Sequence, residues 1–145
     1  MIRPAQLRGA QRGAVAVEAA LILPAALMIA AVTAGGWRLS EVRADAQSAA
    51  EVAARAGSLA PTVSQGNAVG QRVAQAELSG TRCSDSVITI DSSALTRPVG
   101  STGFTSVRVR CTVRLSDLLV PGMPGAVHVE STARSTVDSH RERHT

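Results

Sequence analysis

The sequence has almost no aromatic residues: tyrosine is absent, and Trp37 and Phe104 are the only aromatic residues. A core that depends on large rings is therefore excluded, and any core must be built from Val, Leu, Ile and Ala. Cysteine is scarce too, because Cys83 and Cys111 are the only two. They lie 28 positions apart with no second cysteine pair or close histidine partner. This spacing fits a disulfide better than a zinc site and indicates an oxidising compartment.

The sequence also lacks lysine, so that all fifteen basic residues are arginine. The formal net charge of +4 is unevenly placed, because Arg3, Arg8 and Arg12 precede the first acidic residue, Glu18. The remaining chain is close to neutral, and the basic character is partly a property of the N-terminal segment. Nucleic-acid binding therefore has little support, and no nucleic-acid partner is expected.

Recognisable catalytic motifs are absent as well. Serines are plentiful, but His128 lies in a strand pattern without a nucleophile motif, and neither a phosphate-binding loop nor a metal-spaced cluster occurs. His140 and His144 lie four positions apart near the C-terminus, but no third ligand accompanies them. A polar tail over 139–145 is the simpler interpretation. We therefore expect a protein that is not an enzyme and that uses no cofactor or metal.

What the sequence does contain is one long apolar block. From Ala14 to Trp37 the only charged residue is Glu18. This length suits one membrane-spanning helix over 14–37, which needs about 20 apolar residues, and Trp37 falls at the expected interface. The arginines before the block place the N-terminus in the cytoplasm and everything after the block outside. Pro24 lies inside the span and is expected to kink the helix locally.

The sequence leaves three kinds of processing open. A secretory signal cut after Ala34 would release a soluble binding protein. A permanently anchored surface protein would keep its N-terminus. Cleavage between Gly13 and Ala14 would keep the apolar helix and make Glu18 the fifth residue of the mature chain. The new ammonium of Ala14 would then lie one helical turn from Glu18, in the same or a neighbouring subunit, and the helix dipole would also favour the carboxylate.

Residues 12–24, RGAVAVEAALILP, resemble the processing site of the TadE-like minor pilins, the pseudopilins of the Tad/Flp pilus system. The shared pattern is a basic residue, Gly13, small and apolar residues, Glu18 at the fifth place after the glycine, and an apolar run closed by proline. Residues 53–57, AARAG, resemble the Ala-rich, Arg-Gly-containing stretch that follows the anchor in that family. The family commonly has an aromatic residue where this chain has Ala19, and major Flp pilins are much shorter. A minor subunit therefore fits better.

This resemblance implies cleavage by a membrane aspartyl prepilin peptidase after Gly13, retention of the apolar helix as an anchor, and a structural part in pilus assembly. The implied partners are the prepilin peptidase, other pilins and pilus assembly proteins, and the lipid bilayer. The implied location is the cell membrane, with a single pass, a cytoplasmic N-terminus, an extracytoplasmic C-terminal domain, and incorporation in a surface pilus as a further expectation.

The rest of the chain predicts an α+β fold of pilin-like layout. The helix is expected to continue out of the membrane as one element over 14–56, with Gly57 and Pro61 ending it. A weaker second helix is predicted over 67–78. Three antiparallel strands are predicted after it. The predicted organisation of the chain has five parts: a basic leader (1–13), a transmembrane helix (14–37), a helical stalk (38–60), an extracytoplasmic α+β domain (61–138) and a polar tail (139–145).

The three strands are predicted over 87–90, 105–116 and 127–137. In the middle strand the odd positions are apolar and the even positions are mostly arginine, so one face is expected to be buried and the other solvated. The arginines at 108, 110 and 114 are interpreted as this solvated face, partly paired with Glu130 across the sheet. A disulfide between Cys83 and Cys111 would tie the segment before the first strand to the middle of the second.

Overall fold

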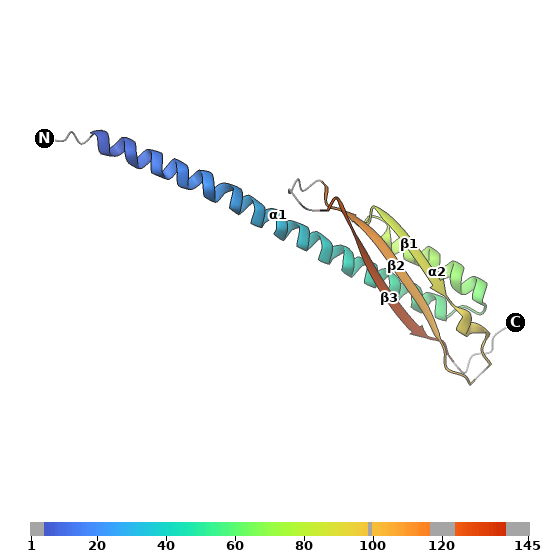
Figure 1. The fold of residues 1–145 in the computed structure, drawn as a ribbon. Coiled ribbons are helices and arrows are strands. Elements are labelled where there is room, and N and C mark those ends of the chain that lie inside the picture. Colours follow the sequence, from blue (N-terminus) through green and yellow to red (C-terminus); the bar gives the residue numbers. More distant parts are fainter. Residues whose placement is uncertain (1–4, 99, 117–123, 139–145) are drawn as a thin grey trace.

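The fold is α+β, with one long helix, a second shorter helix and a small antiparallel sheet (Figure 1). A computed structural model describes residues 5–98, 100–116 and 124–138, with side chains from residue 16 onward. The predicted histidine pair in the tail lies outside these residues. The elements are α1 (Ala5–Ser58), α2 (Val63–Leu78), β1 (Asp85–Asp91), the 3-10 helix η1 (Ser93–Thr96), β2 (Phe104–Arg114) and β3 (Ala126–Thr136).

Helix α1 has 54 residues and is about 80 Å long. Its N-terminal half extends away from all other elements, whereas its C-terminal half lies along the sheet and α2 (Figure 1). The helix begins at Ala5 rather than at residue 14, because residues 5–13 are mostly Ala, Gln, Leu and Arg, which are good helix formers. It passes through Pro24 as one continuous helix. Whether this proline bends the axis stays a prediction.

The C-terminal end of α1 differs from the expectation in one detail. Gly57 does not cap the helix: it lies inside α1, and the positive-φ glycines are Gly80 and Gly100 among the described residues. The helix ends at Ser58, one residue after Gly57, and the Ser58 hydroxyl donates a hydrogen bond to the Arg55 carbonyl at 2.9 Å. A Cβ on Gly57 would lie 3.2 Å from the Gly66 carbonyl oxygen, so this glycine permits a close approach of α2.

Helix α2 begins earlier than the predicted 67–78. Thr62 caps it, since its side chain accepts a hydrogen bond from the Gln65 amide at 3.3 Å. The predicted start at residue 67 was wrong, because the helix also includes residues 63–66 with Gly66, and the predicted interruption at Gly70 does not occur. Both glycines instead lie where α2 packs against its neighbours, and a Cβ on either would approach a side-chain methyl carbon to 2.9 Å.

The sheet has the order β1-β2-β3, with both pairs antiparallel. The three predicted strands are confirmed, with ends that shift by one or two residues. α1 packs against β2 and β3, and α2 packs beside it against β1, so that both helices lie against the sheet. The buried positions of β2 are the odd ones, as the alternation predicts, and they include Val107, Val109, Cys111 and Val113.

The core is made of small side chains. One cluster joins alanines of α1 to Val107, Val109 and Ala133, and the second surrounds Val42 and Cys111. Neither aromatic residue is buried, because Trp37 and Phe104 are both exposed. Residues 38–60, predicted as a helical stalk, therefore do not stand free: the face of α1 from Val42 to Ala54 packs against the sheet and α2, and together they form the folded domain.

The close packing of α2 yields a test of the fold. In Gly66→Ala the new methyl would lie 2.9 to 3.0 Å from Leu95 Cδ1, the Gly57 carbonyl oxygen and Ser92 Oγ. We expect a loss of about 1 to 3 kcal/mol of unfolding free energy, measured by pulse proteolysis of the full chain in urea. Gly36→Ala is the matched control, because a Cβ there meets nothing within 4 Å. Equal stability of the two variants would contradict this packing.

Candidate functional site

The N-terminal part of α1 carries an apolar surface that the rest of the chain does not cover. Its most apolar window has a mean hydropathy of 2.1 and is 0% buried. By length and composition this is the one helix in the described part of the chain that could cross a membrane. Eight large apolar side chains in this segment are between 51% and 72% exposed: Val17, Leu21, Ile22, Leu23, Leu27, Met28, Ile29 and Val32.

The folded domain begins to cover α1 before the apolar segment ends. Ala31 is half-buried, Gly35 is buried, and Leu39 and Val42 follow on the same face at a spacing of three or four. Trp37, on another face, is 73% exposed. The apolar segment and the stretch of α1 that packs in the folded domain are thus two parts of one continuous helix.

The predicted processing site lies inside α1. The Gly13–Ala14 peptide is helical in the uncut chain, and Glu18 follows one turn later with an exposed side chain. Among the described residues no ion pair is formed by Glu18. Its predicted partner is the ammonium of Ala14, which exists only after cleavage, so the pairing stays a prediction.

The predicted disulfide is present. Cys83 and Cys111 are bonded, with their Cα atoms 5.5 Å apart. Cys111 is fully buried in β2, and Cys83 lies in the turn that follows α2. Its neighbour Ser84 is held to the same strand, because both its amide and its hydroxyl donate to the Thr112 carbonyl, at 2.9 and 2.8 Å. The bridge therefore fixes the connection between α2 and β1 onto the middle strand.

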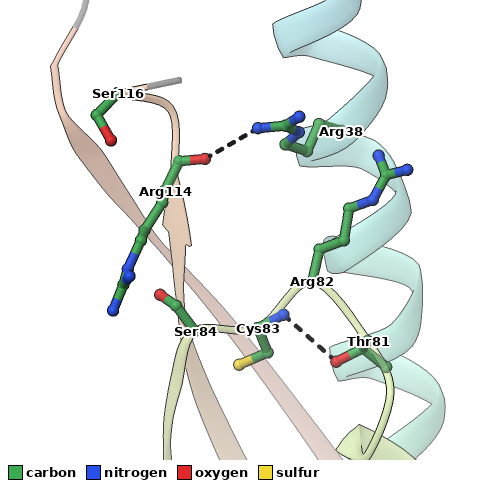
Figure 2. A pocket seen from close by; sticks show the side chains of 7 residues that line it. All are labelled: Arg38, Thr81, Arg82, Cys83, Ser84, Arg114 and Ser116. Atoms are coloured by element: carbon green, nitrogen blue, oxygen red, sulfur yellow. Dashed lines mark hydrogen bonds between the residues drawn. The ribbon is translucent and has the colours of Figure 1, made fainter. Parts of the chain in front are cut away.

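Beside the disulfide lies a cleft of about 520 Å³, shown in Figure 2. Arg38 extends from α1 across this cleft, and its Nη1 donates to the Arg114 carbonyl at 3.3 Å. Arg82, next to Cys83, extends beside α1 and forms a salt bridge with Glu41 at 3.2 Å. The cleft is lined by Arg38, Thr81, Arg82, Cys83, Ser84, Arg114 and Ser116.

Sequence reasoning missed this cleft. Its residues come from α1, the turn before β1 and the end of β2, so only the tertiary structure brings them together. The one available signal is that Arg38 directly follows Trp37 at the end of the apolar block.

The outer face of the sheet is solvated, as predicted. Arg110 donates two hydrogen bonds to Glu130 Oε2, the shorter at 2.8 Å, and Arg108 Nε lies 3.3 Å from Oε1. The hydrogen bond from Arg110, with the positive charges of both arginines, holds the pKa of Glu130 below its usual range. The predicted pairing of the arginine face with Glu130 is confirmed for Arg108 and Arg110. Arg114 takes no part in it: its carbonyl accepts the bond from Arg38.

Two further sets of polar side chains were singled out in the sequence, the candidate metal ligands and His128. No group of three or more His, Cys, Asp or Glu side chains in the described part of the chain could hold a metal ion. His128 Nδ1 lies 3.1 Å from the Thr112 hydroxyl on the solvated face of the sheet, so that the two side chains contact each other across neighbouring strands.

No family model, curated protein or solved structure matches this chain. The resemblance to TadE-like minor pilins therefore rests on residues 12–24 and 53–57 and on the layout of the chain.

The disulfide yields a quantitative expectation for stability. Cys83→Ala combined with Cys111→Ala opens a loop of 28 positions. We expect a loss of about 3 to 4 kcal/mol in the chain-entropy model, measured by pulse proteolysis of the full chain. Reductant should destabilise the unaltered chain by a similar amount and leave the double variant unchanged. The double variant could also lose stability because the packing of Cys111 is lost. In that case the double variant would be destabilised, but the unaltered chain would keep its stability after a reductant has cleaved the bond. That result would contradict a stabilising role of the disulfide.

Proposed function

We propose that this protein is a minor pilin or pseudopilin of the Tad/Flp type, a single-pass membrane subunit whose leader is removed by a prepilin peptidase after Gly13. The observation that carries the proposal is that α1 has two parts with different surroundings. Its N-terminal part has an exposed apolar surface, and the same helix continues without a break into the folded domain, where it packs against the sheet and α2. Such a helix can anchor the subunit before assembly and pack against other subunits afterwards.

The secreted alternative accounts less well for this architecture. Cleavage after Ala34 would cut α1 inside a helical stretch, directly before the buried Gly35. The four backbone amides of residues 35–38 would then lose their helical partners, directly before Leu39 and Val42 of the core. A chain that keeps α1 whole retains the helix on which the sheet packs.

The permanently anchored alternative provides no partner for Glu18. A carboxylate at the centre of a membrane helix costs about 2.5 to 3.5 kcal/mol, less near the interface, and usually has a partner. Cleavage after Gly13 would create a positive ammonium at Ala14 and a new helix N-terminus, both within one turn of Glu18. In a neighbouring subunit the same ammonium would set the axial register of two helices packed side by side.

The cleavage site is tested by mass spectrometry of protein purified from its native membrane. We expect a mature chain that begins at Ala14, whereas signal peptidase would give Gly35 and a permanent anchor Met1 or Ile2. Gly13→Leu should abolish cleavage, because the peptidase site requires the small residue. Gly9→Leu is the matched control, with the same substitution in the leader, and should be cleaved normally. If Gly13→Leu and the unaltered chain have the same N-terminus, the proposed site is wrong.

The role of Glu18 is tested separately from cleavage. Glu18→Ala should leave cleavage largely intact but reduce the subunit in sheared pili by about tenfold, which corresponds to about 1.4 kcal/mol of lost pairing. Glu51→Ala is the control, since Glu51 is exposed on the same helix and bonds only to Gln47 within the described chain. Normal incorporation of Glu18→Ala would contradict the pairing with Ala14.

A further inference from the structure

The sheet has two edges, one along β1 and one along β3. In the described part of the chain no backbone hydrogen bond from another element reaches the outer side of either strand. β1 and β3 are both antiparallel to β2, and they therefore run parallel to each other. β3 also runs in the same direction as α1, away from the apolar segment (Figure 1). A parallel contact between β3 of one copy and β1 of a second copy would thus leave both copies pointing the same way.

The charges at the two edges are opposite in sign and match in position. The strand register places Asp91 of β1 and Arg134 of β3 in one row across the sheet. A second row, six residues along the strands, has Asp85 at the β1 edge and His128 at the β3 edge. All four side chains are exposed and lie on the solvated face. Each edge therefore has two groups about 20 Å apart, acidic on β1 and basic on β3.

These groups can still bind a partner from another copy. Within the described residues the side chains of Arg134 and Asp85 form no hydrogen bond or ion pair. Asp91 accepts a hydrogen bond from the Ser93 amide at 3.0 Å, and a carboxylate can accept several. His128 contacts β2 through Nδ1, which leaves Nε2 for a second contact.

We propose that the β1 edge of one copy docks against the β3 edge of the next copy, with Asp91 paired to Arg134 and Asp85 paired to His128. Glu130, the remaining acid of this face, would meet Val87, and it is already paired with arginines of its own copy. The contact is heterologous, so each copy keeps one edge for a further copy. This inference rests on the membrane-anchored part of the proposed function and does not depend on the site of cleavage.

Contacts between two like edges are less favourable. Two antiparallel β1 strands paired about their midpoint would place Asp85 opposite Asp91, and like charges in opposite positions are destabilising. Two antiparallel β3 strands centred on Thr132 would place Glu130 opposite Arg134, which is favourable by charge. That contact would, however, point the two α1 helices in opposite directions, which anchorage in one membrane does not allow.

Cysteine cross-linking of the full chain in its native membrane tests the contact. Thr89→Cys on β1 and Thr132→Cys on β3 place exposed thiols in a row that lies between the two charged rows. Two differently tagged copies, each with one of these changes, are co-expressed and treated with a short bismaleimide. We expect a dimer of the two copies, and a ladder of larger species when every copy carries both thiols. Neither single variant should cross-link to itself.

Charge reversal then identifies the paired groups. Arg134→Asp in the copy with Thr132→Cys should lower the yield of dimer about fivefold or more, because an attraction becomes a repulsion. Asp91→Arg in the copy with Thr89→Cys should restore the yield, which also shows that the loss is not caused by misfolding. The matched control is Arg72→Asp, the same change at an exposed position of α2, and it should leave the yield unchanged.

Each other outcome overturns the inference. Cross-linking of Thr132→Cys to itself would assign the β3 edge to a contact between two β3 strands. Equal loss of dimer in the Arg72→Asp control would mean diffuse attraction between charges, and absence of rescue by Asp91→Arg would mean that Arg134 has another partner.

Carbonate extraction of the same membranes separates this inference from the proposed function. A chain that is released by carbonate is not anchored, which would overturn both. A chain that stays in the membrane but gives no dimer of the two tagged copies would overturn the edge contact alone.

Discussion

The structure depends on one helix that meets two environments. Over residues 19–30 α1 is apolar on every face, and that surface is exposed within the part of the chain that the structure describes. From about residue 31 the helix becomes apolar on one face only, and that face is covered by the folded domain. Because both parts share one continuous backbone, the position of the folded domain along the helix axis is fixed by the sequence of α1.

The close packing around α1 requires small residues. Alanines on α1 and glycines on α2 let the helix backbones approach until the Gly57 and Gly66 positions nearly touch, and this approach leaves no room for aromatic rings. A core of Ala and Val buries little area per residue, so that it contributes less hydrophobic stabilisation than a core of large side chains. The Cys83–Cys111 bridge offsets this by restricting the unfolded chain.

Periodicity predicted most of the fold, since the alternation in β2 and the apolar block in α1 are long, regular signals. The α+β class, the three strands and the pairing of Arg108 and Arg110 with Glu130 follow from such patterns, whereas the disulfide was predicted from the presence of only two cysteines. The missed features share a different cause. Gly57 was expected to end a helix, but its role and that of Gly66 and Gly70 is steric and becomes visible only when α1, α2 and the elements beside them are packed. The same holds for the cleft, whose residues are far apart in the chain.

Charged residues of α1 mark the two ends of its apolar stretch, and the second end lies where the folded domain begins. Glu18 and Arg38 stand at opposite ends of an apolar stretch, and each carries a charge that a bilayer would hold at its interface and not in its interior. Arg38 is also tied to β2 through the Arg114 carbonyl, and Arg82 is tied to α1 through Glu41. Both contacts close the end of the folded domain that lies nearest the apolar segment. In the proposed topology the depth of α1 in the bilayer would therefore also set the depth of this end of the domain, because the contacts of Arg38 and Arg82 hold the two parts together.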